Sequence, residues 1–161
     1  MSKVTQYLAD RHVPFTTLEH QDAATAIAEA SALVLPPWKV AKTVVLDTKE
    51  GHVLAVVPAD RRVDLHLVRA ALDDPHARLA DEAEIMRDYP SYELGAIPPI
   101  ARLTGTVTLV DPEIARLESI VFASGRQDES VRIETQDLLD DPQVRVLPII
   151  VPPTFGEDWL E

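Results

Sequence analysis

The spacing of apolar residues divides the first third of the chain into short helices and short strands. Apolar side chains at helical spacing predict a helix over residues 3–11, and residues 15–19 alternate as a strand does. Asp22 is a plausible N-cap for an alanine-rich helix that reaches Leu33. Helical spacing and strand alternation therefore both occur before the first long apolar run.

That run, residues 40–46, is rich in β-branched side chains and predicts a strand. A second apolar run covers residues 52–57, and the residues between, Asp47 to Gly51, have the length and glycine of a hairpin loop. The two runs are therefore expected to pair as antiparallel neighbours.

The rest of the chain continues the interleaving. Three aspartates are expected to cap helix starts: Asp64, Asp81 and Asp111. Further strands are expected at residues 77–80, 106–110, 119–123 and 131–134. A polar turn is expected at 124–130, a stiff irregular loop with exposed carbonyls at 91–101, and a final helical turn or two at 135–139. Because several consecutive strands are hairpin-linked, we expect an α/β (α+β) fold with a mixed sheet flanked by helices.

Length and composition fit one compact domain. The chain has 161 residues, of which 46% are hydrophobic and 26% charged. We expect a single domain over residues 1–145. A proline-rich tail over 146–161 is expected to be extended, and to pack as an arm through Phe155 and Trp159.

The net charge of −12 limits the partners. A broad cationic surface for DNA or RNA is excluded, so any nucleic-acid contact must be local or assisted by another protein. The acidity is equally explained as a means of staying in solution. The chain has no cysteine, no signal-peptide pattern and no apolar run long enough to cross a bilayer, so we expect a cytoplasmic protein.

Lys42 is the residue that fits its surroundings least. It lies within the apolar run 40–46, and on a strand it shares a face with Val40, Val44 and Leu46. An unpaired buried ammonium is costly, so this face must open onto water, a carboxylate or an anionic ligand. The alternative is a lysine whose stem lies on apolar surface while its amine reaches solvent.

The familiar catalytic motifs are absent. No phosphate-binding glycine loop and no serine-hydrolase elbow occurs, and the five histidines are too scattered to predict a zinc site. Polar residues near strand ends remain, at Asp60, Arg61, Ser124 and Arg126. Each is also explained as a turn cap, a surface ion pair or a solvated turn, and Gly95 to Pro99 as a tight loop.

Four segments, taken in order, carry a resemblance to a known family. They are Val40–Leu46, Val57–Leu65, Gly95–Pro99 and Phe122–Arg126 running into residues 131–133. Thr25-Ala26 and Glu29-Ala30 add to it. Over roughly residues 3–140 the chain resembles the YbaK / prolyl-tRNA synthetase editing-domain family of aminoacyl-tRNA deacylases. The resemblance implies that family's fold, a mostly antiparallel curved sheet flanked by helices.

The resemblance also implies an activity and a site. The activity is metal-independent and cofactor-free hydrolysis of the ester joining a wrong amino acid to the 3′ end of a tRNA. The family's usual substrate is tRNA(Pro) carrying a small amino acid such as Ala or Cys. Lys42, Gly95 and Pro99 would be the catalytic residues. Substrate binding would fall to Thr25, Asp60, Ala96, Ile97, Pro98, Ser124, Gly125 and Arg126.

The expected partner is the 3′ aminoacyl-adenosine end of a mischarged tRNA, with an aminoacyl-tRNA synthetase as a candidate second partner and no membrane or DNA. One departure concerns the loop exit, where relatives commonly follow the proline with an apolar residue and glycine but Pro99 is followed by Ile100 and Ala101. This departure and the acidity favour the alternative of a non-catalytic module that docks on a synthetase or another protein. A third hypothesis is an unrelated α/β protein.

Overall fold

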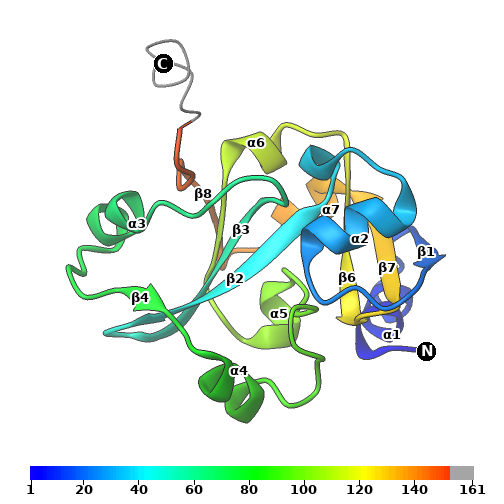
Figure 1. Cartoon of the computed structure of the whole chain (residues 1–161), viewed down its shortest axis with the longest axis horizontal. Coiled ribbons are helices and arrows are strands. Elements are labelled where there is room, and N and C mark those ends of the chain that lie inside the picture. The colour runs from blue at the N-terminus through cyan, green and yellow to red at the C-terminus, as the bar shows by residue number, and fades with distance from the viewer. Residues whose placement is uncertain (153–161) are drawn as a thin grey trace.

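The computed structural model describes residues 1–152 and contains two β-sheets flanked by short helices (Figure 1). The strands are β1 (Phe15–Glu19), β2 (Ala41–Thr48), β3 (Gly51–Pro58), β4 (Arg78–Leu79), β5 (Thr108–Val110), β6 (Ser119–Arg126), β7 (Glu129–Glu134) and β8 (Val144–Val146). The helices are α1 (Lys3–Asp10), α2 (Ala26–Leu33), the 3₁₀ turn η1 (Pro37–Lys39), α3 (Leu65–Leu72), α4 (Glu82–Asp88), α5 (Ala101–Thr104), α6 (Pro112–Ala115) and α7 (Thr135–Leu139).

The strand pairing confirms a mixed, mostly antiparallel architecture. One sheet has the order β1-β7-β6 and is antiparallel throughout, and the other has the order β4-β2-β3-β5-β8. In the larger sheet β2 pairs antiparallel with β3 and β4, whereas β3–β5 and β5–β8 are parallel. The structure therefore has two sheets where the sequence predicted one. An isolated bridge between Val40 and Val121 connects them.

The hairpin of β2 and β3 forms the centre of the molecule. Its register runs from Ala41 opposite Pro58 to Thr48 opposite Gly51, which leaves a two-residue turn shorter than the predicted loop. Both faces of the hairpin are covered. Ala41 and Val45 on one face are almost as buried as Val40 and Leu46 on the other. Burial therefore does not distinguish the face of β2 that carries Lys42 from the opposite face.

Three local predictions are confirmed at the helix starts. Asp64, Asp81 and Asp111 each accept hydrogen bonds from backbone N–H groups in the first turn of α3, α4 and α6. Asp81 and Glu84 form a reciprocal capping box. These signals lie within a few residues of sequence, which explains why they could be recognised without the fold.

Other boundaries were predicted wrongly. The N-cap of α2 is Thr25 rather than Asp22. The Ala28 N–H donates to the Thr25 hydroxyl, whereas the Ala23 N–H lies before the helix and donates to the Gln127 carbonyl (2.8 Å). Most of the predicted turn 124–130 is strand, since β6 continues through Arg126 past a bulge.

Three elements were not predicted at all: the short 3₁₀ turn η1, helix α5 and strand β8. Residues 101–104 are helical (α5) and residues 96–100 are buried, so the second half of the expected exposed loop packs inside. Strand β8 pairs with β5 across the expected domain boundary at 145/146, and Ile149 beyond it is fully buried. The predicted arm through Phe155 and Trp159 lies outside the described residues.

Candidate functional site

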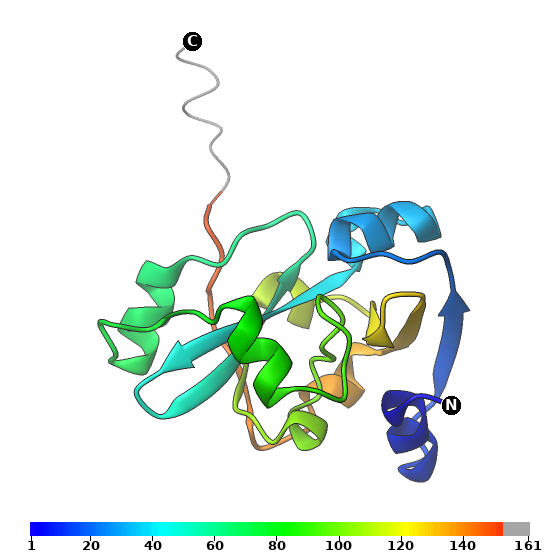
Figure 2. The same cartoon turned by 60° about the horizontal axis from the view of Figure 1, so that its bottom comes forward.

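A cavity of about 450 Å³ lies between the start of α2, the first half of β2, and the chain from β4 to residue 97. In Figure 2, the blue helix α2 lies near the start of β2 and the green helix α4 lies in front of the hairpin. Thr25 and Ala26 line one wall, Lys42 to Val45 another, and Gly95 and Ile97 a third. Most of the lining is apolar, with Ile85 and Leu79 on the α4 side. Its volume is in the range of small-molecule sites.

Lys42 combines partial burial with a defined hydrogen bond. Its Nζ donates to the carbonyl oxygen of Arg61 at 2.6 Å, and two N–H donors remain. Burial lowers the pKa of Lys42; the negative charge of Asp60 opposes this shift and the positive charge of Arg62 adds to it. Lys42 is therefore held on the cavity wall by the chain that follows β3.

Gly95 brings the loop against the start of α2. Its φ of +80° lies in the left-handed region, and a Cβ placed there would stand 2.0 Å from the Ala24 carbonyl oxygen. Only glycine permits this approach, which sets two walls of the cavity side by side. Ala96, Pro98 and Pro99 follow directly but are buried away from the cavity lining.

The departure after Pro99 is accommodated by α5. Ile100 takes the N-cap position of that helix, and Ala101 is its first residue, 1% exposed. The glycine of this region is Gly105, which caps the C-terminus of the helix with a φ of +70°. Ile100 and Ala101 therefore do not reach the cavity wall.

The expected residues on β6 lie apart from the cavity. Arg126 makes two 3.0 Å contacts with the carboxylate of Asp128 and lines a separate hollow of about 230 Å³. Ser124 is buried and donates to Glu129 Oε1 at 2.6 Å. Gly125 acts indirectly, because its carbonyl accepts from the Glu93 N–H (2.8 Å) just before the Gly95 loop.

Gln127 is a lining residue that the sequence did not reveal. Its Nε2 donates to the Leu94 carbonyl at 2.8 Å, and its backbone N–H donates to Glu93 Oε1 at 3.0 Å. Gln127 therefore ties the β6–β7 turn to the loop that ends at Gly95. It lies in a stretch that reads as an ordinary polar turn, so only tertiary structure reveals this role.

A series of hydrogen bonds links α2 to β7 and to His20. Glu29 is 4% exposed and hydrogen-bonds the Ser130 hydroxyl, which lies 2.8 Å from His20 Nε2. Burial raises the pKa of Glu29 to about 7; the Ser130 hydrogen bond and His20 partly oppose the shift. The carboxyl of Glu29 therefore carries its proton up to near-neutral pH.

Glu29→Gln is expected to stabilise the protein at high pH. The folded-state pKa near 7 exceeds the reference value of 4.5, so folding favours the protonated form. Ionisation of buried Glu29 therefore lowers the free energy of unfolding. This loss is absent below about pH 4.5, grows between pH 4.5 and 7, and reaches its full value of at most about 3 kcal/mol above pH 7. Glutamine keeps a hydrogen bond to Ser130 without the charge. Urea unfolding should therefore show a gain of about 1–3 kcal/mol at pH 8.5 that disappears at pH 5.

Glu19→Gln is the matched control, because Glu19 is exposed and its substitution removes the same charge. In the Glu19→Gln variant, the difference in the free energy of unfolding between pH 8.5 and pH 5 should stay within about 0.5 kcal/mol of the wild-type difference. A Glu29→Gln effect that is the same at both pH values would contradict the assigned proton.

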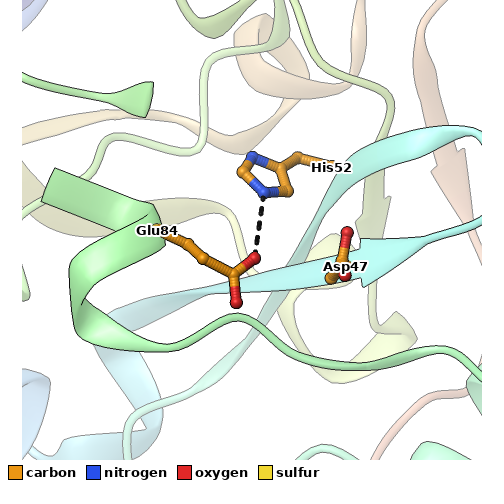
Figure 3. Close-up of side chains that lie close together, drawn as sticks. All are labelled: Asp47, His52 and Glu84. Carbon is orange, nitrogen blue, oxygen red and sulfur yellow. Dashed lines mark ion pairs between the residues drawn. The ribbon is translucent and has the colours of Figure 1, made fainter. Parts of the chain in front are cut away.

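Three possible metal ligands also come together, at the far end of the hairpin (Figure 3). Ligand atoms of Asp47, His52 and Glu84 lie within 4.8 Å of one another, which the scattered histidine spacing did not suggest. Arg78 Nη2, however, contacts Asp47 at 2.8 Å and Glu84 at 2.9 Å. The guanidinium bridges the two carboxylates, so the cluster is explained as an ion-pair network.

The fold and the cavity together define an α+β domain with a largely apolar cavity between a central hairpin and a glycine loop. The chain belongs to the aminoacyl-tRNA editing domain family, whose model matches residues 20–140. No helix within residues 1–152 is long and apolar enough to cross a membrane.

Individual relatives agree with this membership. The Multifunctional Ser/Thr-tRNA deacylase ProXp-y of Escherichia coli (strain K12) is 34% identical over 89 residues, which are 55% of this chain and 53% of that protein. A proline--tRNA ligase of Thermotoga neapolitana is 27% identical over 96 residues, 60% of this chain and 16% of the ligase. The chain thus matches about half the length of the first relative and a small part of the second.

Solved structures share the fold. The crystal structure of a hypothetical protein superposes with a TM-score of 0.84 at 21% identity, over 93% of this chain and all of that one. Another protein, proposed to be a trans-editing enzyme for prolyl tRNA synthetase, gives a TM-score of 0.78 at 21% identity, over 92% and 95% of the two chains.

Proposed function

We propose that the protein is a trans-editing hydrolase that deacylates mischarged tRNA, with tRNA(Pro) carrying Ala or Cys as the substrate. The observation that carries this proposal is the convergence of Lys42, Thr25 and Gly95 on one largely apolar cavity. These residues come from three distant segments, and two of them, Lys42 and Gly95, were expected to act on the ester.

The cavity offers a group for each part of an aminoacyl ester. Val45, Ile85 and Ile97 would surround a small side chain. Lys42 has donors left to hold a phosphate or to polarise the ester carbonyl. Glu82, exposed at the start of α4, supplies a carboxylate for the substrate's α-ammonium group.

The remaining chemistry would come from backbone and substrate. The backbone N–H groups of Gly95 and Ile97, the two residues of the loop that line the cavity, would stabilise the oxyanion that forms as water attacks the ester carbonyl carbon. The attacking water would lose its proton to backbone-bound water or the ribose hydroxyl. The ribose oxygen then leaves with the bonding pair and is protonated. This mechanism needs no metal or cofactor.

Serine and threonine are second candidates for the amino acid. The Escherichia coli relative is named for Ser/Thr-tRNA, and two threonines, Thr25 and Thr43, line the cavity. A size-based apolar pocket distinguishes one methylene by only about 1–3 kcal/mol, so hydroxyl recognition would decide between the two groups.

The partners follow from the charge. A net charge of −12 disfavours a broad tRNA interface, so we propose that the protein contacts chiefly the 3′ end and shares the tRNA with prolyl-tRNA synthetase in the cytoplasm.

A deacylation panel tests the proposal. Purified protein would be mixed with tRNA(Pro) charged with Ala, Cys, Ser, Thr or Pro, with EDTA present throughout and the protein-free rate subtracted. We expect rapid release of Ala or Cys and retention of Pro. Release of Ser or Thr alone would assign the second candidate, whereas inertness on every substrate would support the non-catalytic docking module.

A further inference from the structure

A tryptophan and three cations lie on two neighbouring segments at the base of the β2–β3 hairpin, beside the cavity. We call Trp38, Lys39, Arg61 and Arg62 the Trp38 platform. Trp38 is 49% exposed, unusual for so large an aromatic side chain, and Lys39 Nζ stands 5.8 Å from its ring centre. Lys39 and Arg62 are exposed and Arg61 is half-buried.

The two segments of the platform are held together by the hairpin. Ala41 pairs with Pro58, and the Ala59 N–H donates to the Val40 carbonyl at 2.9 Å. Lys42, on the cavity wall, donates to the Arg61 carbonyl. The platform is therefore rigidly connected to the cavity. Along the chain, Trp38 is four residues from Lys42, which limits the separation of their Cα atoms to about 14 Å.

The cations of the platform have no carboxylate partner among residues 1–152. Lys39, Arg61 and Arg62 make no ion pair within 4 Å to any acidic residue of the described part, although the net charge is −12. In contrast, five other arginines are paired with carboxylates: Arg78, Arg87, Arg102, Arg116 and Arg126. Unpaired cations next to an exposed aromatic ring are the pattern with which proteins bind single-stranded nucleic acid.

We propose that the Trp38 platform binds the single-stranded nucleotides that precede the terminal adenosine of the tRNA. Trp38 stacks on a base, while Lys39 and Arg62 contact phosphates. This inference rests on the proposed function, because it places the terminal adenosine at the cavity. It also explains how so acidic a protein holds a polyanion, since contact is confined to a few nucleotides.

The kinetic test compares a long with a minimal substrate. Trp38→Ala should raise KM for mischarged tRNA about 10-fold, the loss of one stacked base, and leave hydrolysis of the 3′-aminoacyl-adenosine unchanged. Trp38→Phe should retain most of the affinity. Equal losses on both substrates would show a structural role, and an unchanged KM for tRNA would reassign the surface to a protein partner. Either result overturns the proposal.

Salt dependence tests the cations with a matched control. Lys39→Ala/Arg62→Ala should reduce the slope of log affinity against log salt by about 1.4, at 0.7 for each phosphate contact on a single strand. Arg11→Ala/Lys49→Ala removes the same charge from α1 and from the far turn of the hairpin, and should leave the slope unchanged. Equal slopes in the two double variants would contradict phosphate contact at the platform.

Fluorescence tests the platform even if the protein hydrolyses nothing. Trp159 is the other tryptophan of the chain, so Trp159→Phe leaves Trp38 as the sole reporter. A short RNA ending in CCA should quench this emission saturably, and Lys39→Ala/Arg62→Ala should weaken the binding. Failure of the deacylation panel with quenching intact would reject the hydrolase alone, and absent quenching would reject the platform.

Discussion

Lys42→Ala is expected to reduce kcat/KM for deacylation at least about 100-fold, the usual effect of removing a donor that stabilises developing charge. The ammonium lies on the cavity wall with two free donors, and no other lysine or arginine of the described chain lines the cavity. Its replacement leaves the apolar walls without a cation. Single-turnover release of the amino acid from the substrate identified by the panel is the direct measurement.

Two further variants separate charge from shape. Lys42→Met keeps most of the side-chain volume without the charge and should be as inactive as Lys42→Ala. Lys42→Arg keeps the charge in a bulkier group and should recover part of the rate. Thermal unfolding of each variant shows whether the fold is retained. A folded Lys42→Ala protein within about threefold of the wild-type rate would remove Lys42 from the reaction.

Gly95→Ala is expected to cost about 2 kcal/mol or more of stability and to abolish deacylation. The left-handed φ of +80° alone costs a residue with a Cβ about 1–2 kcal/mol. In addition, the Cβ would overlap the Ala24 carbonyl at 2.0 Å, so one wall of the cavity must move away from the other. Urea unfolding and the deacylation assay report the two effects separately.

Gly105→Ala is the matched control for this substitution. Gly105 also has a left-handed φ, of +70°, but a Cβ there meets nothing within 4 Å. It should therefore show only the conformational cost, with activity retained. If Gly95→Ala behaved like Gly105→Ala in both assays, the close approach of the loop to α2 would not matter for the site.

Much of the fold was predictable because its signals are local. The apolar runs of β2 and β3 and the capping aspartates of α3, α4 and α6 lie within single segments, and these elements are present as expected. The start of α2 was not predictable in this way. Its N-cap is Thr25, and the Ala23 N–H just before it donates to the carbonyl of Gln127, about a hundred residues further along the chain.

The candidate site was likewise predictable only where its signals are local. By itself, the sequence singled out Lys42 as a cation in an apolar strand, and Gly95 through the order of motifs around it. Only the tertiary structure decided that Gly95 and Lys42 share a cavity while Pro99, Ser124 and Arg126 lie outside its lining, and that Gln127 and Ile85 belong to it. The reason is physical: residue type and local spacing fix which groups are available, whereas the walls of a cavity are set by packing between distant segments.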